Sequence, residues 1–177
     1  MMRRLVIAFA ALLLASCSSM ALPTIESVGV VESVGESEGW PSHITLAVEV
    51  NNPTSRIKLL SGRVRLSYGG RRVAMFTLED KVVVPARSKA IVEVPLHLAV
   101  QRHTQTMAFR EALREHRAEP ISIDWQVALR SRMTYISREQ EARPIAEVFS
   151  AEQLEALWQM LDMMMKSIGS HLVGVYD

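Results

Sequence analysis

The chain has 177 residues, of which 49% are hydrophobic, 22% are charged and 6% are aromatic. These proportions are typical of a single globular domain and exclude a disordered, collagen-like or coiled-coil protein. The formal net charge of +1 lacks the strong basic excess of a nucleic-acid-binding protein, and the single cysteine excludes a disulfide framework or a cysteine-based zinc cluster within one chain.

The N-terminal segment predicts export. Arg3 and Arg4 form a short cationic region, and an apolar run from Leu5 to Ala15 follows them. The run has the length of the hydrophobic region of a signal peptide and is too short to span a bilayer as a helix of about 20 residues. We therefore interpret residues 1–16 as a signal peptide.

The end of this segment, Leu14-Ala15-Ser16-Cys17, resembles the lipobox of bacterial lipoproteins. The Cys17 thiol is a soft nucleophile that can take a diacylglyceryl group, and the two small residues before it fit a peptidase that cuts at the modified cysteine. The alternative is an ordinary secretory leader cut after Ser19-Met20-Ala21, with Cys17 incidental. The resemblance implies a lipoprotein that Cys17 and its acyl chains, palmitate among them, anchor to a membrane without spanning it.

The lipobox resemblance also implies a location. Ser18, and not aspartate, follows the lipidated cysteine, and no acidic residue occurs before Glu26. By the sorting rules known for lipoproteins, this argues against retention in the inner membrane and against surface export. We expect residues 17–23 to be a lipidated tether and the protein to lie in the cell envelope, on the outer membrane, facing the periplasm.

Alternating apolar residues predict strands from Thr24 onward. Residues 44–50 alternate between apolar and polar side chains, and Asn51-Asn52-Pro53 ends that strand because proline donates no ladder hydrogen bond. Residues 63–68 alternate again before a turn at Gly69-Gly70, whose two glycines supply the positive φ angles of a tight hairpin. Residues 71–78 return, with Leu66 expected opposite Val73 and Val64 opposite Met75.

The short strands and turn residues along the rest of the chain predict a β-sandwich. A first strand and a loop rich in glycine, glutamate and serine are expected before Trp40. Short strands separated by turn residues are typical of an antiparallel β-sandwich, which we expect to occupy residues 24–149. The further strands are predicted at residues 81–85, 89–99, 121–129 and 133–137.

Two helices are predicted. The first, residues 106–117, is expected to connect the two sheets and to end before Pro120. The second, residues 150–169, is an amphipathic C-terminal helix with a capping box at its start and a glycine at its end, and residues 170–177 form a tail. Its apolar stripe has to pack on its own sandwich, or on a partner or apolar ligand. The residues of that candidate face are Leu154, Trp158, Leu161 and Met165.

Several strand motifs resemble the late embryogenesis abundant type 2 domain, also called the water-stress and hypersensitive-response domain. They are residues 46–53 ending in Asn52-Pro53, Tyr68 before the hairpin glycines, and the Val-Pro pairs at 84–85 and 94–95. The resemblance covers roughly residues 23–149. It implies an immunoglobulin-like or fibronectin-type III-like sandwich and a stress response. The C-terminal helix lies outside it.

No catalytic motif occurs in the sequence. The nucleophile elbow, the phosphate-binding loop and the dinucleotide-binding glycines are missing, and the five histidines form no metal-ligand spacing. His97 alternates with Leu96 and Leu98 and is expected to face solvent, as is Asp124. We therefore predict no catalytic residue, no metal ligand and no cofactor.

A cationic patch is the remaining candidate surface. Arg63, Arg65, Arg71 and Arg72 are expected near one another on the outer face of the hairpin. They could meet lipid headgroups or another anionic envelope polymer, although a solvated strand face explains them as well.

These observations predict a non-enzymatic, lipid-anchored envelope protein, a monomer that binds or braces an envelope protein or lipid partner and no nucleic acid. Two alternatives remain open. A carrier or chaperone of apolar ligands predicts a continuous internal cavity, whereas an envelope hydrolase predicts a cleft with clustered titratable residues.

Overall fold

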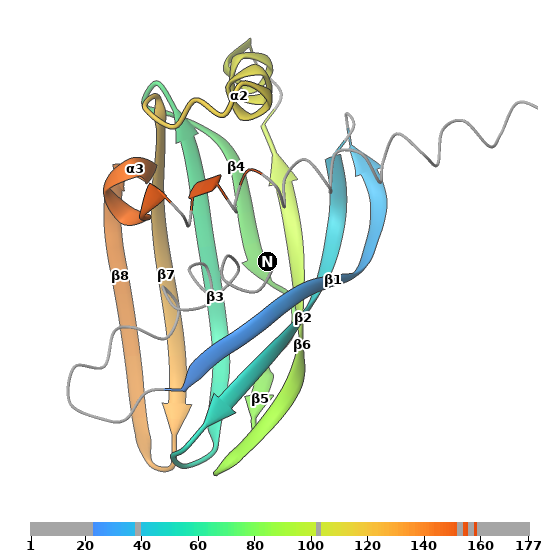
Figure 1. Ribbon diagram of the computed structural model, residues 1–177, viewed down its shortest axis with the longest axis vertical. Coiled ribbons are helices and arrows are strands. Elements are labelled where there is room, and N and C mark those ends of the chain that lie inside the picture. The colour runs from blue at the N-terminus through green and yellow to red at the C-terminus, as the bar shows by residue number, and fades with distance from the viewer. Residues whose placement is uncertain (1–22, 38–39, 102–103, 152–153, 156–157, 159–177) are drawn as a thin grey trace, which may run out of the picture.

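The computed structural model describes residues 23–37, 40–101, 104–151, 154–155 and 158. Antiparallel strands make up most of this part of the chain, and short helices accompany them (Figure 1). Cys17 and the rest of the predicted leader and tether lie outside the described residues. The elements are β1 Thr24–Ser37, β2 Trp40–Asn52, β3 Ile57–Tyr68, β4 Arg71–Leu78, β5 Val82–Val84, β6 Ser88–Val100, α2 Thr104–Arg114, β7 Ile121–Ser131, β8 Thr134–Pro144 and α3 Ile145–Val148.

The strands form one hydrogen-bonded sheet in the order β1-β2-β6-β4-β3-β7-β8, and β5 pairs with β3. β6 belongs to both halves of this sheet, because its first part pairs with β2 and its last part pairs with β4. In Figure 1 the β1–β2 hairpin crosses in front of β3, and buried side chains from both halves form one hydrophobic cluster. The chain is thus mainly antiparallel β, consistent with the predicted β-sandwich.

The alternation of apolar and polar residues explains which side chains of each strand form this core. On β2, Ile44, Leu46, Val48 and Val50 are buried, while the residues between them are partly exposed. The inner residues of β7 are buried in the same way. Because successive side chains of a strand point to opposite faces, each strand gives one apolar row to the interior. The inner residues of β7 are Ile121, Ile123, Trp125, Val127 and Leu129.

The hairpin between β3 and β4 turns as predicted, but its register differs. Gly69 and Gly70 have φ angles of 54° and 79°, a region in which side chains other than glycine are disfavoured. The expected pairing of Leu66 with Val73 is wrong: Leu66 lies opposite Ala74, and Val64 lies opposite Phe76. A register shift after Leu66 adds one residue to one strand, which moves every pair beyond it.

Most strands extend beyond the predicted limits, β1, β3 and β8 among them. β1 continues to Ser37, where a loop was expected, and two register shifts break its alternation. β3 begins at Ile57, and β8 continues to Pro144 although its last residues are exposed and charged. β1 and β8 are edge strands, which need no continuous buried face, so hydrophobic alternation does not reveal their full length. In β3, a register shift between Leu59 and Ser61 interrupts the alternation.

Helix α2 connects β6 to β7 and contacts β4 and β3. It ends earlier than the predicted Arg117, at Arg114, because His116 adopts a left-handed φ of 55°. The Arg117 N–H donates to the Ala112 carbonyl at 2.8 Å, and the His116 N–H donates to the Leu113 carbonyl at 3.2 Å. These two bonds form a Schellman-type C-cap, which stops the helix before Pro120.

The predicted C-terminal helix is described only in part. Ala151, Leu154, Glu155 and Trp158 are helical, and Trp158 is buried in the core cluster. Leu161, Met165 and the rest of the predicted helix lie outside the described residues. Within the described chain, no helix has the length and hydropathy needed to cross a bilayer. The short helix α3 was not predicted.

Candidate functional site

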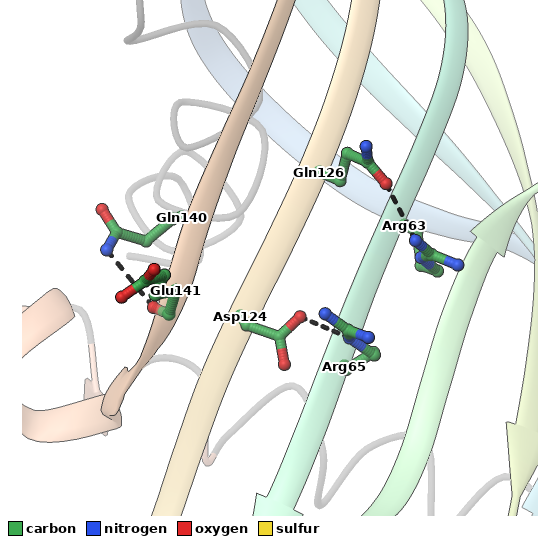
Figure 2. A network of polar contacts seen from close by, with 6 residues as sticks. All are labelled: Arg63, Arg65, Asp124, Gln126, Gln140 and Glu141. Carbon is green, nitrogen blue, oxygen red and sulfur yellow. Dashed lines mark hydrogen bonds and ion pairs between the residues drawn. The ribbon is translucent and has the colours of Figure 1, made fainter.

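Two arginines of the predicted cationic patch, Arg63 and Arg65, pair with side chains on β7. Arg65 Nε lies 2.5 Å from Asp124 Oδ1, and Arg63 donates to the Gln126 side chain at 2.8 Å (Figure 2). Both pairs join β3 to β7 on the outer face of the sheet. Asp124 is therefore a cross-strand partner of Arg65, and its carboxylate neutralises that arginine.

Arg71 and Arg72 lie at the start of β4, beside the hairpin turn. The Gly69 N–H donates to the Pro120 carbonyl at 3.0 Å, which places this turn next to the segment that enters β7. Arg71 and Arg72 are exposed, but Arg63 and Arg65 lie along the strand in contact with Gln126 and Asp124. Two of the four predicted arginines therefore have side-chain partners across β3 and β7, and the other two lie exposed beside the turn.

A cluster that the sequence did not predict lies on the outer face of the sheet. His43 on β2, Glu79 just after β4 and His97 on β6 each offer one ligand atom, and these atoms lie within 4.8 Å of one another. His43 Nδ1 is 2.7 Å from Glu79 Oε1. The two imidazole rings have centroids 5.0 Å apart and are tilted by 50°. We call these three residues the His-Glu-His cluster.

The strand arrangement explains why these side chains meet. His43 and His97 are directly opposite in the β2–β6 register, and Thr77 is opposite His97 in the β4–β6 register. In the described registers, β6 pairs on both sides at Leu96 and His97. Glu79 is two residues beyond Thr77, and its N–H donates to the Pro95 carbonyl at 3.0 Å. The period of a strand thus directs Glu79 to the same face as His97.

The cluster is partly open to solvent. The His43 side chain is 51% exposed and the Glu79 side chain is 32% exposed. His97 is half-buried between its neighbouring strands, and no hydrogen-bond partner reaches its buried Nδ1 among the described residues. The arrangement therefore combines two exposed groups with one half-buried imidazole.

Basic residues are concentrated at the end of the sheet where β1 begins. Thr24 at the start of β1 pairs with Asn51 near the end of β2. The next residue of β2, Asn52, pairs with Ser88 at the start of β6. Arg87 N–H donates to the Thr54 carbonyl at 2.9 Å, and the Ser55 and Ser131 hydroxyls are 2.7 Å apart, so the adjoining loops lie together. We call this the basic end. Its exposed cations are Arg56, Lys58, Arg87, Lys89, Arg130 and Arg132.

Lys89 at the basic end is already paired. It contacts Glu26 and lies 3.1 Å from Glu49, which links β6 to β2 and β1. Hydrogen bonds from Glu26 and then Glu49 raise the pKa of Lys89 above its ordinary value, although desolvation acts in the opposite direction. The lysine therefore stays protonated at neutral pH, and its charge is balanced locally.

The candidate face on the C-terminal helix contacts its own domain where it is described. Trp158 is 4% exposed, and its ring stacks on His116 with centroids 5.8 Å apart and an interplanar angle of 3°. Leu154 also packs against the core. The first part of this face is therefore occupied from within the chain.

No family model matches the sequence, and no curated protein matches it. Among solved structures, a protein from Archaeoglobus fulgidus is 15% identical and has a TM-score of 0.34. The alignment covers 66% of this chain and 94% of that chain. The description of the fold therefore depends on the strand order and registers given above.

Proposed function

We propose that the protein is a lipid-anchored, non-enzymatic module of the cell envelope that binds or braces a partner at the membrane surface. The lipobox-like sequence before Cys17 motivates the anchor. The observation that carries the proposal is the short spacing between this residue and the domain: β1 begins at Thr24, seven residues later. A chain of that length spans at most about 25 Å, so acylation of Cys17 would hold the domain close to the bilayer.

The concentration of exposed basic residues at one end of the domain supports this arrangement. The tether enters the sheet at the basic end, where Arg56, Arg87 and Arg132 are exposed. Met133, beside them in the β7–β8 turn, is 89% exposed. A short tether holds this end toward the membrane, and anionic headgroups attract basic side chains within about a Debye length. We propose the outer membrane, with the domain in the periplasm, as its location.

The finer fold is also a proposal. An immunoglobulin-like or fibronectin-type III-like sandwich of the late embryogenesis abundant type 2 kind is supported by the role of Asn52. Its side-chain amide donates to the Pro85 carbonyl at 2.7 Å and to the Ser55 carbonyl at 2.9 Å. The Asn-Pro and Val-Pro motifs that carry the resemblance are therefore joined directly in this fold. A stress role would follow from the same resemblance.

The anchor is tested by replacing its nucleophile. Metabolic labelling with a fatty acid should mark the wild-type protein and leave Cys17→Ser unlabelled, because serine lacks the thiol that forms the thioether. The wild type should remain with membranes on fractionation, whereas the variant should move largely to the soluble fraction. Labelling and membrane retention of Cys17→Ser at the wild-type level would contradict the proposal.

A further inference from the structure

We propose that the His-Glu-His cluster is a binding site for a divalent transition-metal ion of the zinc class. His43, Glu79 and His97 would supply three ligands, and the fourth position would be open to water or to a donor from another molecule. The inference does not depend on the lipid anchor. It rests on the convergence of three ligand side chains from separate strands at the junction of β2, β6 and β4.

The geometry is close to that of a bound ion. Zinc bonds to nitrogen and oxygen of about 2.0–2.2 Å place the ligand atoms of a tetrahedral site about 3.3 Å apart. Here the three ligand atoms lie within 4.8 Å of one another. Small side-chain rotations of His43 and Glu79 close that difference, and both residues have exposed surface that leaves room for such rotations.

An ion pair alone explains the cluster poorly. The His43–Glu79 contact is largely exposed, and exposed pairs of this kind contribute little to stability. It also leaves out His97, whose buried Nδ1 has no hydrogen-bond partner among the described residues. The ligand atoms of all three side chains, in contrast, lie close enough together for one metal ion to use them at once.

The donor types select the class of ion. Two imidazole nitrogens and one carboxylate oxygen suit zinc, cobalt, nickel and copper, whereas calcium and magnesium prefer oxygen donors throughout. With three protein ligands the coordination shell is incomplete, as in zinc sites that keep one position for water or substrate. The ion would lie on the outer face of the sheet, where a donor from another molecule can reach it.

The test measures binding of Co²⁺, a spectroscopic substitute for Zn²⁺, to the full chain. Visible absorption titration should show one tightly bound ion, which added Zn²⁺ displaces. His43→Ala and His97→Ala should each weaken binding more than about a hundredfold, because even residues that only support a metal ligand cost ten- to a hundredfold in affinity when removed. Glu79→Gln should weaken binding and change the absorption spectrum.

Two matched controls locate the ion. Glu93→Gln removes a carboxylate from the same face of β6, and His116→Asn removes a histidine from another part of the fold while keeping a residue that tolerates its left-handed φ. Both variants should bind Co²⁺ as the wild type does. His43 is half exposed, so its replacement should leave the circular dichroism spectrum unchanged. Wild-type affinity in His43→Ala, an equal loss in His116→Asn, or no binding by the wild type would overturn the proposal.

Discussion

Asn52 shows how one polar side chain can organise an end of this domain. It is fully buried, donates to two backbone carbonyls, and accepts hydrogen bonds from the Thr54 N–H at 3.0 Å and the Thr54 hydroxyl at 2.8 Å. Buried amides are tolerated when their donors and acceptors are paired in this way. The residue joins the β2–β3 loop to the segment that follows β5.

Replacing Asn52 with aspartate should destabilise the domain by about 3 kcal/mol, since two carbonyls lose their donor and a charge becomes buried. Aspartate keeps the side-chain oxygen that accepts hydrogen bonds from Thr54. The loss of stability therefore measures the effect of the two lost donated hydrogen bonds and of the new charge. Urea denaturation of the wild type and variant measures the change. Asn51→Asp is the matched control, because Asn51 is exposed and its replacement should change stability by less than about 0.5 kcal/mol. Equal stability of both variants would contradict this account.

At the scale of elements, hydrophobic alternation predicts some strands better than others. β2 and β7 each bury one face continuously, so strict alternation revealed them. β1 and β8 lie at the two ends of the strand order, and register shifts or exposed charges interrupt their patterns. The one-residue error in the β3–β4 register has the same origin, because a bulge after Leu66 leaves no mark in the hydrophobic pattern.

The first turns of the C-terminal helix should be part of the domain core. Trp158→Ala should lower the free energy of unfolding by about 3 kcal/mol or more, because it removes a buried aromatic side chain and its stack on His116. Chemical denaturation of the full chain gives the value.

Met107→Ala on α2 serves as the control for that measurement. Met107 is 67% exposed, so its truncation should change stability by less than about 0.5 kcal/mol. If Trp158→Ala were as mild as Met107→Ala, the helix would have to be a docking element for a partner and not part of the core.

At the scale of the whole molecule, the basic end and the hairpin turn lie at opposite ends of β3. If the chain is anchored as proposed, this arrangement predicts that the basic end faces the bilayer. In the Cys17→Ser background, Arg56→Gln with Arg130→Gln should weaken binding to phosphatidylglycerol vesicles roughly thirtyfold, at about 1 kcal/mol for each basic residue lost. Co-sedimentation measures the affinity.

The control for this prediction removes the same charge elsewhere. Arg71→Gln with Arg114→Gln changes two exposed arginines near the hairpin turn and α2. Binding should stay within a few-fold of the parent, and vesicles of phosphatidylcholine alone should bind neither form. An equal loss in both double variants would mean that net charge, and not the orientation of the domain, controls the interaction.

The candidate metal site illustrates what sequence spacing cannot show. His43 and Glu79 are 36 residues apart, and nothing local relates either of them to His97. They meet because β6 is flanked by both β2 and β4 at His97, which is a property of strand order. The alternation that placed His97 outside the core was visible in the sequence, since Leu96 and Leu98 are buried on either side of it.

The pairing of β3 with β7 has a kinetic consequence. This long pairing joins residues as far apart as Arg63 and Gln126, which are separated by 63 positions. Closing such a distant contact slows folding relative to local hairpins, and this sheet cannot be completed until β7 is available. If the chain is exported unfolded, as the proposed signal peptide implies, this sheet would stay incomplete until β7 has crossed the membrane.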